Sequence, residues 1–312
     1  MTVSTIQFSV IVPNYNNAAT LARAIESILG QDYPAHEIIV VDDGSRDESA
    51  AVVARFGARV RYIFQENAGV SAARNHGARV ATGNWLAFLD ADDIYLPGRL
   101  SAHAAWLARD PGLDFLFGDQ AQRSPDDQHQ LMAISASAAG RAFVARQPEV
   151  VELVLEPDDF GAMIADGFSE IRTLSIPRAT FIALDGFPLE HKIGEDLHFF
   201  IRLFLRSRRG GVVNLPLAVY YIYEGSALRK DPIGAQRGFI VALESLRIEM
   251  DIASVAIRRG WLAKLRQGRL SLAYMYLRQQ RKRTALASVL PLLRDTPSLR
   301  SLRDIVSVAR GL

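Results

Sequence analysis

The first hundred or so residues alternate short apolar runs with longer stretches in which apolar residues recur at helical spacing. The short runs are rich in branched aliphatic and aromatic residues, which predicts strands at 8–12, 37–41, 60–64 and 85–89. Helical spacing predicts helices over 21–29 and 70–81. Strands and helices that alternate in this way form an α/β fold with a mostly parallel sheet and crossover helices. Polar residues follow each strand, at the edge where open α/β sheets bind ligands.

Local signals predict where some of these elements begin and end. We expect Pro13 to end the first strand, because a proline has no N–H for the ladder. Gly30 should end the first helix, and Asp47 should cap the helix that follows the second strand.

The second part of the chain is less regular. Residues 124–130 are typical of an exposed loop, and 131–170 show no clear period. Further along, the pattern predicts an ordered stretch at 171–176, helices at 177–184 and from Glu195, a strand at 212–223, and helices from residue 232 onward with breaks at Gly260, Pro291 and Pro297.

Composition is that of a compact globular protein. The chain has 312 residues, of which 49% are hydrophobic and 22% charged. It has no cysteine, so disulfides and thiolate metal sites are excluded and any metal must have oxygen or histidine ligands. The first seven residues lack the features of a secretory signal, and no apolar run is long enough to cross a bilayer, so a cytoplasmic location is expected.

The net charge of +2 conceals an asymmetry along the chain. Residues 251–312 contain 13 Lys or Arg and 3 Asp or Glu, a net charge of +10, which leaves −8 for residues 1–250. The acidic part and the basic C-terminal part are therefore expected to have different roles.

Three carboxylates follow directly after the strand at 85–89. Asp90, Asp92 and Asp93 would repel one another at the mouth of the sheet unless a cation lay between them. A few hard oxygen ligands suit Mg²⁺ or Mn²⁺ bound together with a diphosphate. The alternative is a turn in which these residues cap a helix that begins at Pro97.

Other polar residues are expected at the same edge. Asp42 and Asp43 end the second strand, Tyr15 follows the first, and the stretch 67–75, which contains Arg74, follows the third. An aromatic ring, hydrogen-bond acceptors and a cation site are what a nucleoside diphosphate requires. Arg74 could pair with phosphate or with the carboxylates.

Four segments in this order, 10–17, 37–47, 67–75 and 88–93, resemble the donor half of family 2 glycosyltransferases with the GT-A fold, a Rossmann-like sheet flanked by helices. The resemblance implies a nucleotide-sugar donor, with UDP the first choice, and a divalent cation, Mn²⁺ or Mg²⁺. It places Tyr15 near the base, Asp43 on the base or ribose, Asp90 near the ribose, and Asp92 on the metal as part of the family's DxD motif. The donor-binding residues that it implies are Pro13, Tyr15, Asp43, Asn67, Arg74 and Asp90.

A weaker resemblance continues through 184–187 and 194–203. In the family an acidic pair here supplies the catalytic base, which implies Asp196 for that role and Glu195 as a possible acceptor contact. An attacking hydroxyl must lose its proton, and a carboxylate can take it. The alternative is that both residues only stabilise the first turn of a helix. His191 and His198 flank the pair and are interpreted as ordinary helix or loop residues.

The family often has a loop near 223–230 that closes over the donor and carries a metal-binding histidine. This chain has no histidine there, so Glu224 or Arg229 is the possible contact with diphosphate. The Gln-x-x-Arg-Trp motif and the membrane spans of processive members are also missing from the sequence, which favours transfer of a single sugar. The implied domains are a catalytic domain at 1–230, with a donor half at 1–110 and an acceptor half at 111–230, and a basic helical region at 231–312.

The apolar and cationic residues of 261–277 allow two interpretations. The stretch is either an amphipathic helix on an anionic membrane, which would place the protein at the inner face of the membrane, or a helix packed on the catalytic domain or a partner subunit. Nucleic-acid binding is not expected, since no recognised motif accompanies the charge.

The sequence thus predicts an inverting, metal-dependent transfer of one sugar to a glycan or lipid-linked acceptor in cell-surface polysaccharide assembly. The alternative is a catalytically silent module of the same fold that binds a sugar nucleotide or a glycan. A nucleotidyltransferase is disfavoured, because no glycine-rich loop follows the first strand.

Overall fold

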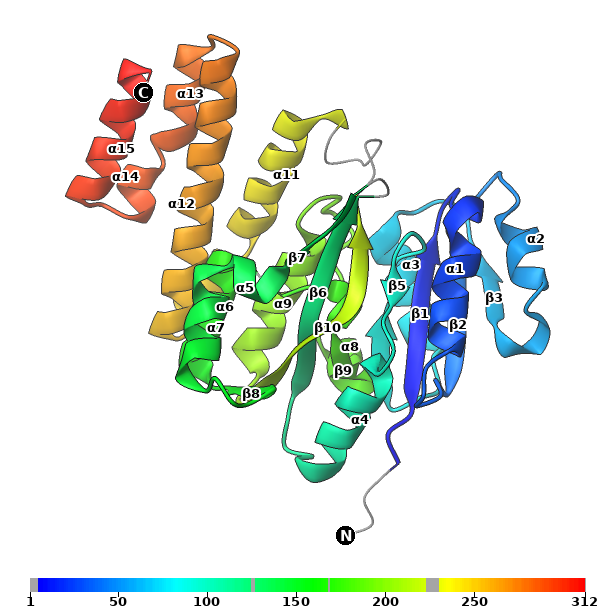
Figure 1. Cartoon of the computed structure of the whole chain (residues 1–312). Helices are drawn as coiled ribbons and strands as arrows, with labels where there is room; N and C mark the ends of the chain where they lie inside the picture. Colours follow the sequence, from blue (N-terminus) through cyan, green and yellow to red (C-terminus); the bar gives the residue numbers. More distant parts are fainter. Residues whose placement is uncertain (1–4, 125–126, 168, 223–229, 312) are drawn as a thin grey trace.

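The computed structural model of the chain describes residues 5–124, 127–167, 169–222 and 230–311. One twisted sheet runs through the molecule, with helices on both of its faces and a group of C-terminal helices to one side (Figure 1). The sheet has ten strands in the order β3-β2-β1-β4-β9-β6-β10-β5, with β7 beside β6 and β8 beside β10.

The first half of the sheet is parallel, as predicted. Its strands are β1 (Phe8–Asn14), β2 (Glu37–Asp42), β3 (Arg61–Phe64) and β4 (Trp85–Phe88). The helices that connect them are α1 (Ala18–Leu29), α2 (Ser49–Ala54) with the short η1 (Gly57–Arg59), and α3 (Val70–Val80). Because β2 and β4 lie on opposite sides of β1, the connections diverge after β1 and leave a crevice at its carboxyl end.

Two of the local predictions are wrong. The first strand continues through Pro13 to Asn14. Successive residues of a strand hydrogen-bond to opposite neighbours, and Pro13 faces the β4 side, where pairing with β1 has ended at Ile11. Asp47 is not the N-cap of α2, which is Glu48. Its carboxylate instead accepts from the backbone N–H groups of Ala18 and Ser49, so it ties two loops together.

The second half of the sheet makes the whole sheet mixed. It contains β5 (Ile94–Tyr95), β6 (Phe115–Ser124), β7 (Asp127–Met132), β8 (Glu152–Leu155), β9 (Ser175–Pro177) and β10 (Gly210–Tyr221). The predicted loop at 124–130 is wrong, since β7 pairs with β6 in an antiparallel hairpin. Strand β9 pairs with both β4 and β6 and so joins the two halves.

Helices of this half cover the sheet or extend from it. They are α4 (Arg99–Arg109), α5 (Ala133–Ala136), α6 (Ala138–Arg146), α7 (Pro157–Asp166), α8 (Arg178–Ala183) and α9 (Glu195–Arg206), with the short η2 (Ile171–Thr173) before β9. Phenylalanines of β6, α7 and α9 form the centre of the larger core cluster, where Phe160 and Phe204 stack with ring centroids 5.1 Å apart.

The C-terminal region is helical, as predicted. It consists of α11 (Pro232–Ser245), η3 (Glu249–Asp251), α12 (Val255–Arg278), α13 (Lys282–Val289), α14 (Leu292–Asp295) and α15 (Leu299–Arg310). Breaks do fall at Pro291 and Pro297, but Gly260 lies inside α12. A Cβ at Gly260 would be 2.0 Å from the carbonyl oxygen of Gly161, so this glycine lets α12 cross α7 in close contact.

Of the two interpretations of residues 261–277, the structure favours packing. Trp261, Leu265, Leu272 and Tyr276 are buried, and Trp261 donates its ring N–H to the carbonyl of Leu243 in α11. Within the described residues, no helix combines the length and the apolar character needed to cross a bilayer.

Candidate functional site

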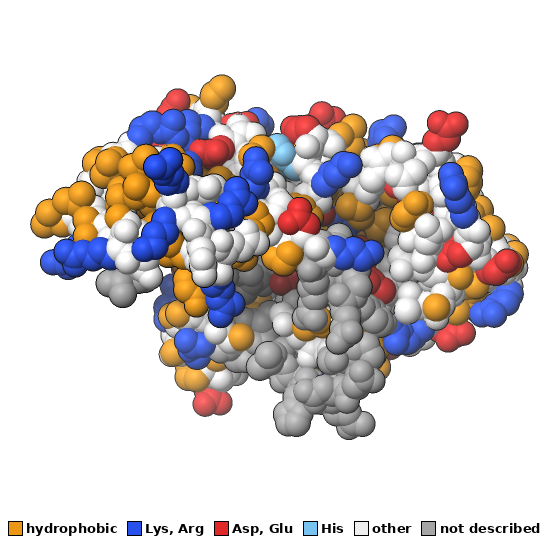
Figure 2. Space-filling view, turned by 90° about the horizontal axis from the view of Figure 1, so that it is seen from above, with side chains coloured by type: hydrophobic (Ala, Val, Ile, Leu, Met, Phe, Trp, Pro, Cys, Tyr) orange, Lys and Arg blue, Asp and Glu red, His pale blue; other side chains and the backbone are white. Residues whose placement is uncertain are grey.

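The candidate site lies at the carboxyl ends of β1, β2 and β4. These ends point upward in Figure 1, and Figure 2 shows the molecule from that side. The loop after β4 carries Asp90, Asp92 and Asp93 beside the crevice where the connections diverge. This position is the one that the sequence predicted for the carboxylates.

Arg74 connects the donor side of the site with the acidic pair. Its guanidinium lies 2.6 Å from Asp90 and 3.2 Å from Glu195, and it is buried, with its charge 5.3 Å from the ring centroid of Phe187. Burial would raise the pKa of Asp90, but the cations of Arg74 and Arg172 outweigh it and hold that pKa below its usual range. Two carboxylates 105 residues apart in sequence (90 and 195) are therefore held by one cation.

Arg172 is a second buried cation of the site, and the sequence did not reveal it. Its Nε lies 2.6 Å from Asp93, its Nη1 lies 3.0 Å from Glu170 and also donates to Gln120, and its Nη2 lies 3.8 Å from Asp90. The guanidinium also covers the ring of Tyr220 at 4.4 Å. No local motif marks this arginine, because its partners come from four separate segments.

The carboxylate of Asp93 is buried and bound to other parts of the protein. Its side chain is 1% exposed and accepts from the backbone N–H of Tyr221 in addition to Arg172. Burial raises its pKa to about 7, although Arg172 opposes the shift. The next helix, α4, begins at Arg99 after Gly98, so the alternative in which these carboxylates cap a helix at Pro97 is wrong.

Asp92 differs from both neighbours because its carboxylate forms no ion pair with any residue that the structure describes. Burial and the charge of Asp90 raise its pKa, and its own backbone N–H and the charges of Arg172 and Arg23 offset this only in part. In the described part of the chain, no group of three or more His, Asp or Glu side chains could hold a metal ion by itself. A single free carboxylate fits a cation that takes its other ligands from substrate phosphates and water, as Mg²⁺ commonly does.

The remaining predicted donor residues line the crevice or support it. Tyr15 is 50% exposed directly after β1, whereas Pro13 is buried within β1. The Asp43 carboxylate is buried and accepts from the Gln65 side chain at 2.7 Å and from the backbone N–H groups of residues 68 and 69 at 2.9 and 2.8 Å. Asn67 donates to the Asp43 carbonyl at 2.8 Å. Asp43 thus shapes the loop before α3, and its contact with a base or ribose stays a prediction.

Glu195 and Asp196 form the first turn of α9, after Gly194 in a left-handed conformation at φ 79°. One oxygen of Asp196 accepts from the N–H of Leu197 at 2.6 Å, and no described residue donates to its other oxygen. The charge of Asp196 acts on two groups that the sequence did not single out. It helps to raise the pKa of Glu170 to about 7, after burial and against Arg172, and it opposes the lowering of the pKa of the half-buried Lys264 of α12.

The histidines add little to the site. Burial, with the charge of Arg202, lowers the pKa of His198 to about 4, so this histidine is neutral at pH 7. His191 forms a hydrogen bond of 2.9 Å with Ser245. Both contacts lie within the protein, which agrees with the interpretation of these histidines as ordinary helix or loop residues. Glu224 and Arg229 lie outside the described residues.

The carboxyl of Glu195 predicts a pH dependence of stability. Burial and the neighbouring Asp196 raise its pKa from 4.5 to about 7 despite Arg74, so the folded chain binds this proton more tightly than the unfolded chain. The resulting stabilisation is complete below about pH 4.5 and is lost as the pH rises through about 7. We expect Glu195→Gln to reduce the fall in unfolding free energy between about pH 5 and 8, measured by urea titration. The exposed Glu66→Gln should leave the fall unchanged, and an unchanged profile in Glu195→Gln would contradict the assignment.

Residues 9–149 match the family model described as glycosyl transferase family 2. An uncharacterized glycosyltransferase of Nostoc sp. is 44% identical over 99 residues, which are 30% of this chain and 31% of that protein. Glycosyltransferase GlyA of Streptococcus pneumoniae is 46% identical over 90 residues, 28% of this chain and 13% of that protein. The matched part is thus less than a third of the length of these relatives.

Solved structures resemble almost the whole chain. S. aureus TarS in complex with UDP-GlcNAc has a TM-score of 0.64 at 19% identity, covering 98% of this chain and 91% of that one. The mannosyltransferase PcManGT from Pyrobaculum calidifontis, in complex with GDP-Man and Mn²⁺, has a TM-score of 0.60 at 19% identity, covering 99% and 82%. At this identity the likeness concerns the fold, and it confirms the expected glycosyltransferase fold class with its helical C-terminal region.

Proposed function

We propose that this chain, whose residues 9–149 match the family model described as glycosyl transferase family 2, transfers a single sugar from a nucleotide diphosphate to a glycan or lipid-linked acceptor. The observation that supports this most is the free carboxylate of Asp92, held beside the Asp90–Arg74–Glu195 ion pairs at the mouth of the sheet. A cation on Asp92 would bring the diphosphate close to the acidic pair on α9. We propose that this reaction is a step in the assembly of a cell-surface polysaccharide.

The donor half, residues 1–110, is proposed to hold the nucleotide, with UDP the first choice. Tyr15 is exposed enough to cover a base. The loop shaped by Asp43 and Asn67 meets the end of β2, the strand next to β1. Asp90 is proposed to contact the ribose through the oxygen that is not bound to Arg74. TarS and PcManGT bind UDP-GlcNAc and GDP-Man, respectively, so both kinds of nucleotide belong in a test.

The acceptor half, residues 111–230, is proposed to supply the base. The acceptor hydroxyl oxygen would form a bond to C1 of the sugar while the bond from C1 to the diphosphate oxygen breaks, with inversion. The hydroxyl proton would pass to the free oxygen of Asp196. The divalent cation, when bound, offsets the charge that develops on the departing diphosphate. Arg74 is fixed by two ion pairs and adds positive charge on the same side.

The alternative is a silent module that binds a sugar nucleotide without transfer. Incubation of the full chain with UDP-sugars and GDP-sugars and Mn²⁺ separates the two, because a transferase releases the free nucleoside diphosphate. We expect release for one donor, with a rate that rises when the matching acceptor is added. Tight binding of a donor with no release under any of these conditions would favour the silent module.

Asp92→Ala tests the cation assignment by binding alone. We expect Mn²⁺ to increase the affinity of the unaltered chain for UDP and to have no such effect on the variant, since the carboxylate proposed to hold the cation has been removed. Isothermal titration with UDP, with and without Mn²⁺, measures both affinities. Glu66→Ala, an exposed acidic residue after β3, is the matched control. A variant that keeps the full effect of Mn²⁺ would show that Asp92 is a loop residue that does not hold the cation.

A further inference from the structure

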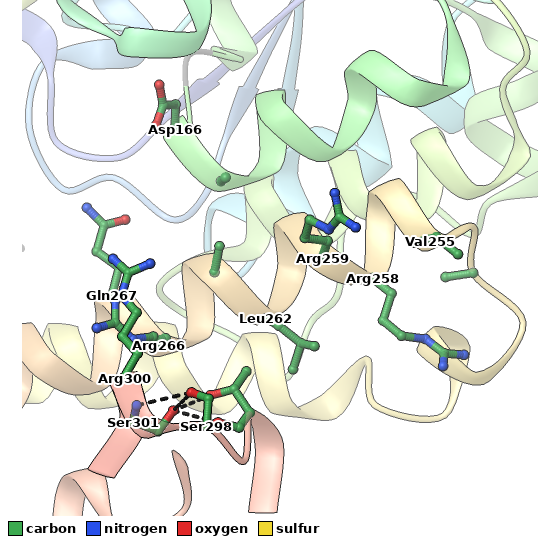
Figure 3. Close-up of a pocket in the computed structure, with 14 residues that line it drawn as sticks. Asp166, Val255, Arg258, Arg259, Leu262, Arg266, Gln267, Ser298, Arg300 and Ser301 are labelled. Carbon is green, nitrogen blue, oxygen red and sulfur yellow. Dashed lines mark hydrogen bonds between the residues drawn. The ribbon is translucent and has the colours of Figure 1, made fainter. Parts of the chain in front are cut away.

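A groove of about 800 Å³ lies outside the candidate site, between the end of α7, the first half of α12 and the start of α15 (Figure 3). Small and apolar side chains such as Ala165, Ala263 and Leu262 contribute to its lining. Figure 3 shows Leu262 with Arg258 and Arg259 on one side and Arg266 and Arg300 on the other. The lining of the groove therefore combines apolar and polar side chains.

Arginine dominates the charge of the groove. Arg258, Arg259, Arg266 and Arg300 line it, whereas Asp166 is the one acidic residue among the described lining residues. Arg258 donates to the carbonyls of residues 250 and 251, and Arg266 pairs with Asp304. Arg259 and Arg300 are exposed and form no hydrogen bond or ion pair with any other residue that the structure describes. Two arginine charges are thus available to an anion.

Large aliphatic side chains stand exposed at the rim. Val255, which lines the groove, is 74% exposed, and Leu299, between the lining residues Ser298 and Arg300, is 78% exposed. Ile252, next to the lining residue Ala253, is 87% exposed. Seen from above in Figure 2, hydrophobic and cationic side chains also mix over the C-terminal helices, at its left. Exposed apolar groups among cations are typical of surfaces that contact membranes.

We propose that this groove and its rim dock the protein on an anionic lipid bilayer, with lipid phosphates between Arg259 and Arg300 and the rim side chains in the interfacial layer. The charge of the C-terminal region, +10 over residues 251–312, complements such a surface. The docking surface therefore includes only the first part of the stretch 261–277, through Leu262, Ala263 and Arg266, whereas Trp261, Leu265, Leu272 and Tyr276 are buried against neighbouring helices. It does not depend on whether the chain transfers a sugar.

Vesicle sedimentation with the full chain tests the charged part of the surface. We expect binding to phosphatidylcholine vesicles that contain phosphatidylglycerol and little binding to phosphatidylcholine alone. Arg259→Gln with Arg300→Gln should weaken the binding about thirtyfold, because each arginine near an anionic surface contributes a factor of about five. Arg283→Gln with Arg310→Gln removes the same charge from exposed positions of α13 and α15 outside the groove and should have a much smaller effect.

The apolar rim has its own test. Ile252→Ser with Leu299→Ser should reduce the binding that remains at high salt, whereas Leu189→Ser with Leu215→Ser, at exposed positions elsewhere, should not. Four results would overturn the proposal: no binding to anionic vesicles, equal losses in the two arginine pairs, release by inorganic phosphate at constant ionic strength, or a dimer in sedimentation that Arg259→Gln with Arg300→Gln dissociates. The last two would assign the groove to a free phosphate or to a second copy of the chain.

Discussion

Asp196→Asn is expected to lower the rate of sugar transfer by about a hundredfold to ten-thousandfold, the usual contribution of a general base. The substitution keeps the shape of the side chain and an oxygen that can accept from the N–H of Leu197, so α9 should keep its first turn. It removes the carboxylate that we propose as the proton acceptor. Affinity for the donor should change little, because the proposed donor contacts lie on other elements. Single-turnover rates and calorimetric donor binding measure the two effects separately.

Two comparisons make the test of Asp196 sharper. Asp158→Asn makes the same change in the first turn of α7, at an exposed position, and should leave the rate unchanged. Glu170→Gln removes a carboxyl that lies near Asp196 and has its pKa raised to about 7, a value well suited to a base at neutral pH. If Asp196→Asn keeps its rate while Glu170→Gln loses it, the base is Glu170 and our assignment is wrong.

The sequence predicted which residues meet at this edge of the sheet because the edge is built from strand ends. The carboxyl ends of parallel strands meet at one edge, so residues that follow the runs at 8–12, 37–41 and 85–89 had to come together. What the sequence could not provide was the division of roles among three adjacent carboxylates. Asp90 and Asp93 are paired with Arg74 and Arg172, and only the folded chain shows that Asp92 has no ion pair among the described residues.

Predictions failed where tertiary contacts decide the local structure. Residues 127–130 are polar, yet they belong to β7, which pairs with β6, and backbone pairing leaves little trace in composition. Gly260 was interpreted as a helix break because glycine disfavours helices, but here contact with Gly161 outweighs that preference. The basic tail is a third case, since its charge was evident but the choice between buried and exposed apolar residues depended on α7 and α11.

Arg172→Met should destabilise the fold more than any other single change discussed above, by about 3–5 kcal/mol. The guanidinium is buried and holds Asp93, which is 1% exposed, together with Glu170 and Asp90. Methionine fills a similar volume but leaves Asp93 and Glu170 without the cation that they share, so Arg74 on Asp90 remains as the cation beside the three carboxylates. Arg109→Met breaks an ion pair of 2.5 Å in which the arginine is 63% exposed, and it should cost less than about 1 kcal/mol.

A second substitution distinguishes the loss of charge from the loss of packing. Adding Asp93→Asn to Arg172→Met removes the buried carboxylate that the first change leaves without its cation, so the double variant should be less destabilised than the sum of the two single variants. Urea unfolding of the four proteins gives this coupling. Because Arg172 also lies 3.8 Å from Asp90, beside the proposed donor contacts, the single variant should bind UDP more weakly even at temperatures where it is folded. A change in unfolding free energy below about 1 kcal/mol in Arg172→Met would show that Arg74 alone can balance these carboxylates.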